Sequence, residues 1–155
     1  MTINVLVLCT GNSARSILGE VLINELGAGR FRAFSAGSHP VGRVNPGALD
    51  KLARAGHGIT GLESKSWDRF TGPDAPAIDI VITVCDNAAG EACPVWNGAP
   101  VTCHWGIPDP AADHDFEAAY ERLRQRVEAL VHLPLEEFDA AGRRAALERI
   151  HADFD

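Results

Sequence analysis

The sequence has little positive charge: 14 Lys and Arg residues stand against 21 Asp and Glu, which gives a formal net charge of −7 over 155 residues. A chain with this balance lacks the basic surface that binding to nucleic acid or to an anionic membrane requires. Long hydrophobic runs are also missing, since no stretch approaches the ~20 apolar residues of a membrane-spanning helix. The composition therefore excludes nucleic-acid-binding proteins and integral membrane proteins.

The N-terminal residues contain no basic segment followed by an apolar stretch of signal-peptide length. We therefore expect the protein to be cytoplasmic, in a reducing compartment. The four cysteines are then reactive, metal-binding or incidental rather than structural disulfide partners. A chain of this length buries a sufficient core without metal or disulfides, and we expect a single domain over residues 1–155.

Apolar runs alternate with segments of helical periodicity along the chain. Strands are predicted at Ile3–Leu8, Phe31–Ser35, Ile78–Val84 and Val101–His104. A helix is predicted at Ile17–Leu26, and Asn45-Pro46 is typical of a helix start. This alternation predicts an α/β fold, a single-domain three-layer sandwich in which a four-stranded parallel sheet carries helices on both faces.

The most informative segment follows the first strand directly and reads Cys9-Thr10-Gly11-Asn12-Ser13-Ala14-Arg15-Ser16. Its side chains between Cys9 and Arg15 are small, and Gly11 and Asn12 tolerate unusual backbone angles. Free amides and the positive end of the next helix favour an anion and a thiolate at Cys9. The planar guanidinium of Arg15 can donate hydrogen bonds to two oxygens at once, and Ser16 is placed to donate to the Cys9 sulfur. The segment predicts a cradle for a tetrahedral oxyanion; a buried structural cysteine before an ordinary turn is the alternative.

Two more reactive side chains follow later strands. Cys85 follows the third strand and Asp109 lies just past the fourth, between Pro108 and Pro110. Because the carboxyl ends of parallel strands share one edge of the sheet, we expect both side chains near Cys9. A carboxyl group held between two prolines is suited to act as general acid, although Asp and Pro are also common turn residues.

The remaining cysteines are open to several interpretations. Cys85 and Cys93 flank a loop of small and polar residues, where movement would permit thiol–disulfide exchange. Cys103 falls inside the fourth strand. A zinc site at Cys85, Cys93, Cys103 and His104 is the alternative, but the long spacings lack the close pairs of common structural zinc sites, so no metal is expected. Cys85 and Cys93 can also be without function.

Together these segments resemble the low-molecular-weight protein tyrosine phosphatase superfamily and, within it, the arsenate reductases. The resemblance covers nearly the whole chain and includes the Cys9–Ser16 loop and the Asp109-Pro110 pair. The stretches Val-Cys-Asp-Asn-Ala-Ala-Gly-Glu, which contains Cys85, and His-Trp-Gly-Ile-Pro-Asp-Pro, which begins at His104, are similar to the reductase branch.

The resemblance implies a reaction on arsenate without a cofactor. Cys9 would attack arsenate held by the loop amides and Arg15, and Asp109 would protonate the departing oxygen. Cys85 would then attack the Cys9 sulfur, which releases arsenite. Cys93 would take over the bond to give Cys85–Cys93. A thioredoxin- or glutaredoxin/glutathione-type partner, or mycothiol, would restore the thiols.

Two other functions remain open from the sequence. A phosphatase acting on phosphate monoesters would use the same oxyanion cradle and the same acid. However, Ala111-Ala112 follow the Asp-Pro pair where such phosphatases carry tyrosines, and Tyr120 is the one tyrosine of the chain. A sensor would hold arsenite on Cys9, Cys85 and Cys93 without turnover.

Overall fold

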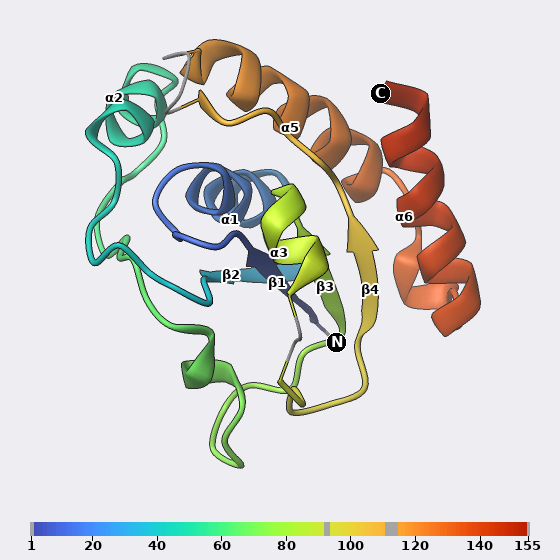
Figure 1. Ribbon diagram of the computed structural model, residues 1–155. Coiled ribbons are helices and arrows are strands. Elements are labelled where there is room, and N and C mark those ends of the chain that lie inside the picture. The colour runs from blue at the N-terminus through green and yellow to red at the C-terminus, as the bar shows by residue number, and fades with distance from the viewer. Residues whose placement is uncertain (1, 92–93, 111–114, 155) are drawn as a thin grey trace.

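A computed structural model describes residues 2–91, 94–110 and 115–154. It contains a four-stranded sheet in which all neighbouring strands are parallel, in the order β2-β1-β3-β4 (Figure 1). The strands are β1 (Ile3–Leu8), β2 (Phe31–Ala36), β3 (Ile80–Thr83) and β4 (Val101–His104). The predicted parallel α/β fold is confirmed. The third strand is shorter than the apolar run Ile78–Val84, because the ladder to β4 covers only its middle.

Seven helical segments connect and cover the strands in the described residues. They are α1 (Arg15–Leu26), α2 (Pro46–Arg54), η1 (Trp67–Phe70), α3 (Asp86–Gly90), α5 (Phe116–Val131), η2 (Leu135–Glu137) and α6 (Ala140–Phe154), of which η1 and η2 are 3-10 helices. The predicted start of α2 is confirmed, since Asn45 Oδ1 accepts the Gly47 amide at 2.8 Å and Pro46 occupies the first position. Among the helices of the described residues, none has the length and apolar character needed to cross a membrane.

The two faces of the sheet are covered differently. On one face, Val5 and Val7 of β1 pack in the large core that α1 and α5 close. On the other face, Leu6 and Leu8 pack against Phe70 of η1 and against Trp96. Alternate residues of one strand therefore enter two cores, as expected for a strand buried on both sides.

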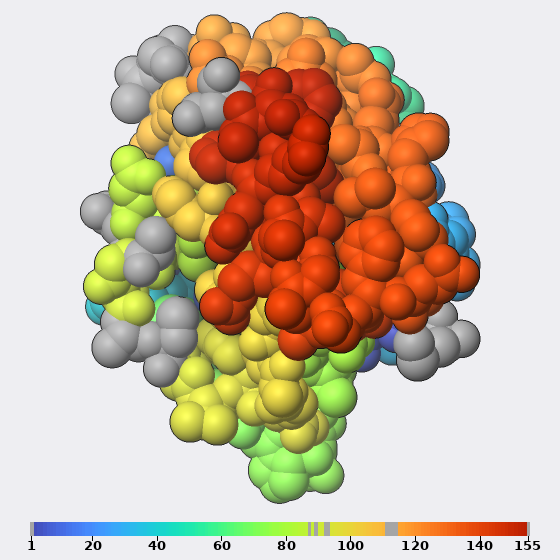
Figure 2. Space-filling model, turned by 90° about the vertical axis from the view of Figure 1, so that its right-hand side faces the viewer, coloured from blue at the N-terminus to red at the C-terminus, as the bar shows by residue number. Residues whose placement is uncertain are grey.

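Helix α6 closes the flank of the sheet beside β4. Trp105, which follows β4 and is 1% exposed, donates its indole N–H to the Leu147 carbonyl at 3.0 Å. Figure 2 views this flank and shows α6 (red) across the surface next to α5 (orange). This packing places the C-terminal turn of α6 beside the carboxyl end of β4, where the functional side chains lie.

Candidate active site

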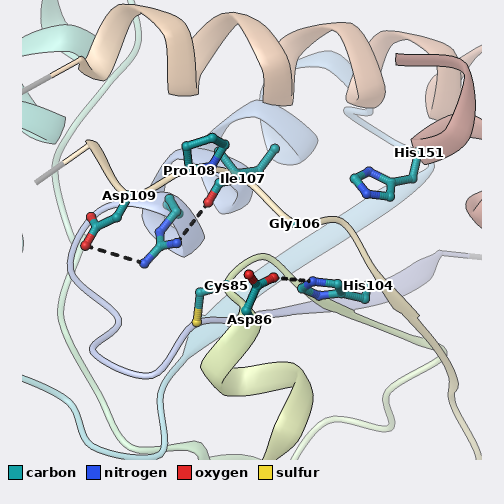
Figure 3. Close-up of a pocket in the computed structure, with 9 residues that line it drawn as sticks. Cys85, Asp86, His104, Gly106, Ile107, Pro108, Asp109 and His151 are labelled. Atoms are coloured by element: carbon teal, nitrogen blue, oxygen red, sulfur yellow. Dashed lines mark hydrogen bonds and ion pairs between the residues drawn. The ribbon is translucent and has the colours of Figure 1, made fainter. Parts of the chain in front are cut away.

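Residues from three strand ends meet at one edge of the sheet. A pocket of about 590 Å³ opens there, and Figure 3 shows the side chains around it. Its lining is formed by Arg15, Cys85, Asp86, His104, Gly106, Ile107, Pro108, Asp109 and His151. Cys9 lies next to Cys85 and is only 7% exposed. The structure therefore brings Cys9, Cys85, Arg15 and Asp109 together at the sheet edge at which the sequence predicts them.

The loop after β1 turns its carbonyl oxygens away from its centre. They accept hydrogen bonds from the amides of the neighbouring segment, namely Thr10 from His39 at 2.9 Å, Gly11 from Val41 at 3.1 Å and Ser13 from Asn45 at 2.8 Å. With these carbonyls engaged outside the loop, we expect the loop amides to face its interior. Ala14, at the N-cap of α1, has only a methyl group and cannot cap the first turn. The interior of the loop is thus suited to an anion.

Asn12 braces this loop from inside. Its backbone has a φ of +45°, which Asn tolerates better than most residues. Its side chain is fully buried, donates to Ser16 Oγ at 2.8 Å and accepts the Lys65 amide at 2.9 Å. The unusual backbone angle that the sequence allows at Asn12 is therefore present. Ser16 Oγ is engaged by Asn12, and a hydrogen bond from Ser16 to Cys9 stays a prediction.

Arg15 connects the loop to the segment after β4. One guanidinium nitrogen donates to the Ile107 carbonyl at 2.9 Å, and the other lies 3.9 Å from Asp109 Oδ2. The Arg15 side chain is 15% exposed and that of Asp109 is 49% exposed. The carboxyl group therefore stands at the mouth of the site, within reach of solvent and of the guanidinium that would bind the anion.

The two thiols form a coupled pair. Cys9 and Cys85 share a side-chain hydrogen bond, and the Cys85 sulfur also accepts the amides of Thr10 at 3.3 Å and Ala88 at 3.4 Å. The Cys9 hydrogen bond and these amides lower the pKa of Cys85 to about 5, against the opposing effect of burial. Donation to Cys85, together with burial, raises the pKa of Cys9 despite the Arg15 charge. These contacts favour the charge on Cys85 over Cys9, and the thiolate that the sequence predicts at Cys9 stays a prediction.

The other two cysteines differ in what the structure describes. Cys93 lies outside the described residues, so its part in a relay stays a prediction. Cys103 is a free thiol buried within β4, and burial raises its pKa to about 11. In the described part of the chain, no three His, Cys, Asp or Glu side chains form a group that could hold a metal ion. The zinc alternative includes Cys93 and is not tested.

Three side chains at this edge received no role from the sequence. Asp86, the first residue of α3, accepts from His104 Nε2 at 3.0 Å (Figure 3). His151 reaches the pocket from α6, and its Nδ1 accepts from Arg126 at 3.1 Å. Glu91 accepts from Thr10 Oγ1 at 2.8 Å. Their proximity depends on α3 and α6 docking at the sheet edge, and no local motif around these residues reports that docking.

Comparison with known proteins agrees with this geometry. The sequence profile of the family described as "Low molecular weight phosphotyrosine protein phosphatase" matches residues 4–143. The arsenate reductase of Bacillus subtilis (strain 168) is 32% identical over 136 residues, which cover 88% of this chain and 94% of that protein. A structure described as an arsenate reductase in the phosphate binding state aligns with a TM-score of 0.71 at 27% identity over 84% of this chain and 98% of its own. The arsenate reductase from Archaeoglobus fulgidus DSM 4304 aligns with a TM-score of 0.68 at 27% identity, over 83% of this chain and 99% of its own.

Proposed function

Because the chain belongs to the low molecular weight phosphotyrosine protein phosphatase family, we propose that it uses the family's oxyanion site to reduce arsenate to arsenite. The observation that carries this proposal is the proximity of the buried Cys9 and Cys85 thiols, which lie close enough for each to shift the pKa of the other. A phosphatase needs one nucleophilic thiol in the loop and has no chemical use for a second thiol in contact with it. A reductase needs the second thiol to accept the bond from the first.

Arsenate binds in the loop after β1. Its oxygens take hydrogen bonds from the amides of Gly11–Ser16 at the start of α1, and Arg15 neutralises their charge. The net charge of the chain is −7, so this local field has to act against the charge of the whole protein. The anion is therefore held by fixed dipoles at short range rather than attracted from a distance.

The first chemical step forms a sulfur–arsenic bond. The Cys9 sulfur attacks arsenic, and one arsenate oxygen departs as water after it receives a proton from Asp109. Asp109 is suited to this role because it stands at the mouth of the site beside Arg15 and is half exposed. The product is a covalent Cys9–arsenic(V) adduct.

The second step moves two electrons to arsenic. The Cys85 thiolate attacks the Cys9 sulfur, a Cys9–Cys85 disulfide forms, and the sulfur–arsenic bond breaks with its electron pair on arsenic. Arsenic(V) becomes arsenic(III) and leaves as arsenite. Cys93 then displaces Cys9 to give a Cys85–Cys93 disulfide, which a thioredoxin- or glutaredoxin/glutathione-type reductant, or mycothiol, returns to two thiols.

Hydrolysis of phosphate monoesters is the second candidate, and the family assignment favours it as a side activity. The aromatic side chains argue against phosphotyrosine as the main substrate. Tyr120 is buried in α5 and hydrogen-bonds to His57 Nε2 at 2.7 Å, and Trp96 and Trp105 are buried. None of these three rings stands free to form a wall against a phenyl group.

The test is arsenite production from arsenate by the purified protein with thioredoxin, glutaredoxin–glutathione and mycothiol systems in parallel. Turnover with any of them supports the reductase and identifies the electron donor. Arsenic bound stoichiometrically without release would indicate a sensor instead. No turnover with all three, together with steady hydrolysis of an aryl phosphate, would contradict the proposal and leave a phosphatase.

A further inference from the structure

The buried thiol pair has to lose a proton before it can reduce arsenate. The Cys9 and Cys85 side chains are hydrogen-bonded to each other, so a proton can pass from one sulfur to the other along this bond. Both sulfurs act as thiolates in turn, Cys9 toward arsenic and Cys85 toward Cys9. When Cys9 attacks, its proton passes along the existing hydrogen bond to Cys85, and Cys85 must release that proton before the second step.

Thr10 offers an acceptor for this proton. Its hydroxyl oxygen lies 3.7 Å from the Cys85 sulfur, and its own hydrogen is donated to Glu91 Oε1 at 2.8 Å. Because the hydroxyl hydrogen points to Glu91, the lone pairs of the same oxygen are available to an S–H group on Cys85. The three groups form a continuous path from sulfur to carboxylate.

Glu91 is held at the end of this path from two sides. It is the C-cap residue of α3, and Cys85 is the N-cap residue of the same helix, so one five-residue helix fixes the span between them. The second carboxylate oxygen accepts from Ser38 Oγ, and the Glu91 side chain is 23% exposed. The carboxylate is therefore both positioned and able to pass a proton on to water.

We propose that Glu91, acting through the Thr10 hydroxyl, takes the proton of Cys85 between the two steps of arsenate reduction. The Thr10 hydroxyl gives its hydrogen to the Glu91 carboxylate and receives the Cys85 thiol hydrogen. The products are a neutral Glu91 carboxylic acid, an unchanged Thr10 and a Cys85 thiolate ready to attack the Cys9 sulfur. Glu91 is thus a positioning residue for proton transfer, and this role depends on the proposed reductase activity.

Other charged groups lie near Glu91. The imidazole of His39 lies 3.6 Å from Glu91 Oε2 and is 79% exposed. Asp86, at the start of α3, lines the same surface hollow as Glu91, Thr10 and His39. The measurements below are therefore repeated in a His39→Asn background, which removes the imidazole beside Glu91.

The experiment is a single-turnover measurement of arsenite release by the reduced full-length protein between pH 6 and pH 8. The ratio of arsenite release to aryl-phosphate hydrolysis is recorded for each variant. Glu91→Gln keeps an oxygen acceptor for Thr10 but cannot take a proton, so this ratio is expected to fall about a hundred-fold, within the range of positioned proton transfer. Its arsenite release should also rise about ten-fold per pH unit, because hydroxide replaces the lost base.

Two further variants separate a proton path from simple packing. Glu63→Gln changes an exposed carboxylate that pairs with Arg69 and should match the wild type. Thr10→Val interrupts the same path, so the double variant Thr10→Val/Glu91→Gln should be no slower than the slower single variant. If Glu91→Gln does not fold, Thr10→Val carries the test alone through the same ratio and pH profile.

The outcomes distinguish this inference from the function on which it depends. A wild-type protein that releases no arsenite at any pH overturns the reductase and the proton path together. A wild-type protein that releases arsenite while Glu91→Gln keeps its ratio and pH profile overturns the proton path alone. An equal loss in both reactions also overturns it, because that result indicates a structural role for Glu91.

Discussion

Asn12 and Ser16, four residues apart in the oxyanion loop, are joined by a buried side-chain hydrogen bond of 2.8 Å. The same Asn12 side chain accepts the backbone amide of Lys65, so one residue couples the loop to a distant segment. The shape of the anion site therefore depends on the Asn12 side chain, whose partners are Ser16 and Lys65 rather than the anion.

Replacing Asn12 should destabilise the protein for two separable reasons. Asn12→Ala removes both hydrogen bonds and places an alanine at a φ of +45°, so the free energy of unfolding should fall by about 2–4 kcal/mol. Asn12→Gly removes the same hydrogen bonds but tolerates the backbone angle, and it should lose less. Urea denaturation measures both, and equal losses would show that the backbone angle contributes nothing.

Gly37 should prove essential to the position of the loop. A Cβ added there would meet the carbonyl oxygens of Thr10 at 2.4 Å and Cys9 at 2.6 Å, so Gly37→Ala must displace the loop. We expect kcat/KM for arsenate and for an aryl phosphate to fall about a hundred-fold, as expected for a misplacement near 1 Å. Gly58→Ala is the matched control, since a Cβ there enters open space, and its rates should stay at the wild-type level.

Cys85→Ser should separate the two chemistries of the site. The hydroxyl cannot attack the Cys9 sulfur to form a disulfide, so arsenite release should disappear under all reductants. Aryl-phosphate hydrolysis should persist, because it requires Cys9, Arg15 and Asp109 alone. Arsenite release at the normal rate by this variant would show that the relay begins at another thiol.

The ionisation of Cys85 should be visible in the pH dependence of stability. Its pKa is about 5 in the folded protein and 9.0 for a free thiol, so between these values the unfolded chain binds a proton that the folded protein does not. The free energy of unfolding of the wild type relative to Cys85→Ser should therefore rise as pH increases from about 5 to about 9. This contribution should be lost as pH falls through 5.

Denaturation of both proteins across this pH range measures the difference directly. Thiolate absorbance in the ultraviolet provides an independent readout, with a midpoint near pH 5 that Cys85→Ser should lack. A stability difference that does not change with pH would contradict the assignment of the negative charge to Cys85.

The sequence predicts most of the fold because its signals are local. The apolar run Ile3–Leu8 and the small residues after it indicate a buried strand and an anion loop, and both are present. The rule that parallel strands end at one edge then places Cys85 and Asp109 near Cys9. These inferences need only the periodicity of each segment and the direction of its strand.

What the sequence does not predict depends on contacts between distant segments. The pKa of Cys85 is lowered because the Cys9 thiol and the amides of Thr10 and Ala88 point at its sulfur. Glu91 accepts the hydrogen bond from Thr10 only because α3 docks beside Thr10. Such side-chain geometry is set by packing over separations of many residues, which no local pattern encodes.

The position of β1 between β2 and β3 also determines the order in which the site can assemble during synthesis. β1 can pair with β2 once residue 36 has emerged, but the loop lacks its Asn12 brace until Lys65 follows. The thiol pair can form only after β3 has paired with β1, and Arg15 gains its hydrogen-bond acceptor only after Ile107 has been synthesised. A nascent chain thus carries an unprotected Cys9 for about half of its translation, and the nucleophile acquires its burial and its hydrogen-bonded partner only when the third strand enters the sheet.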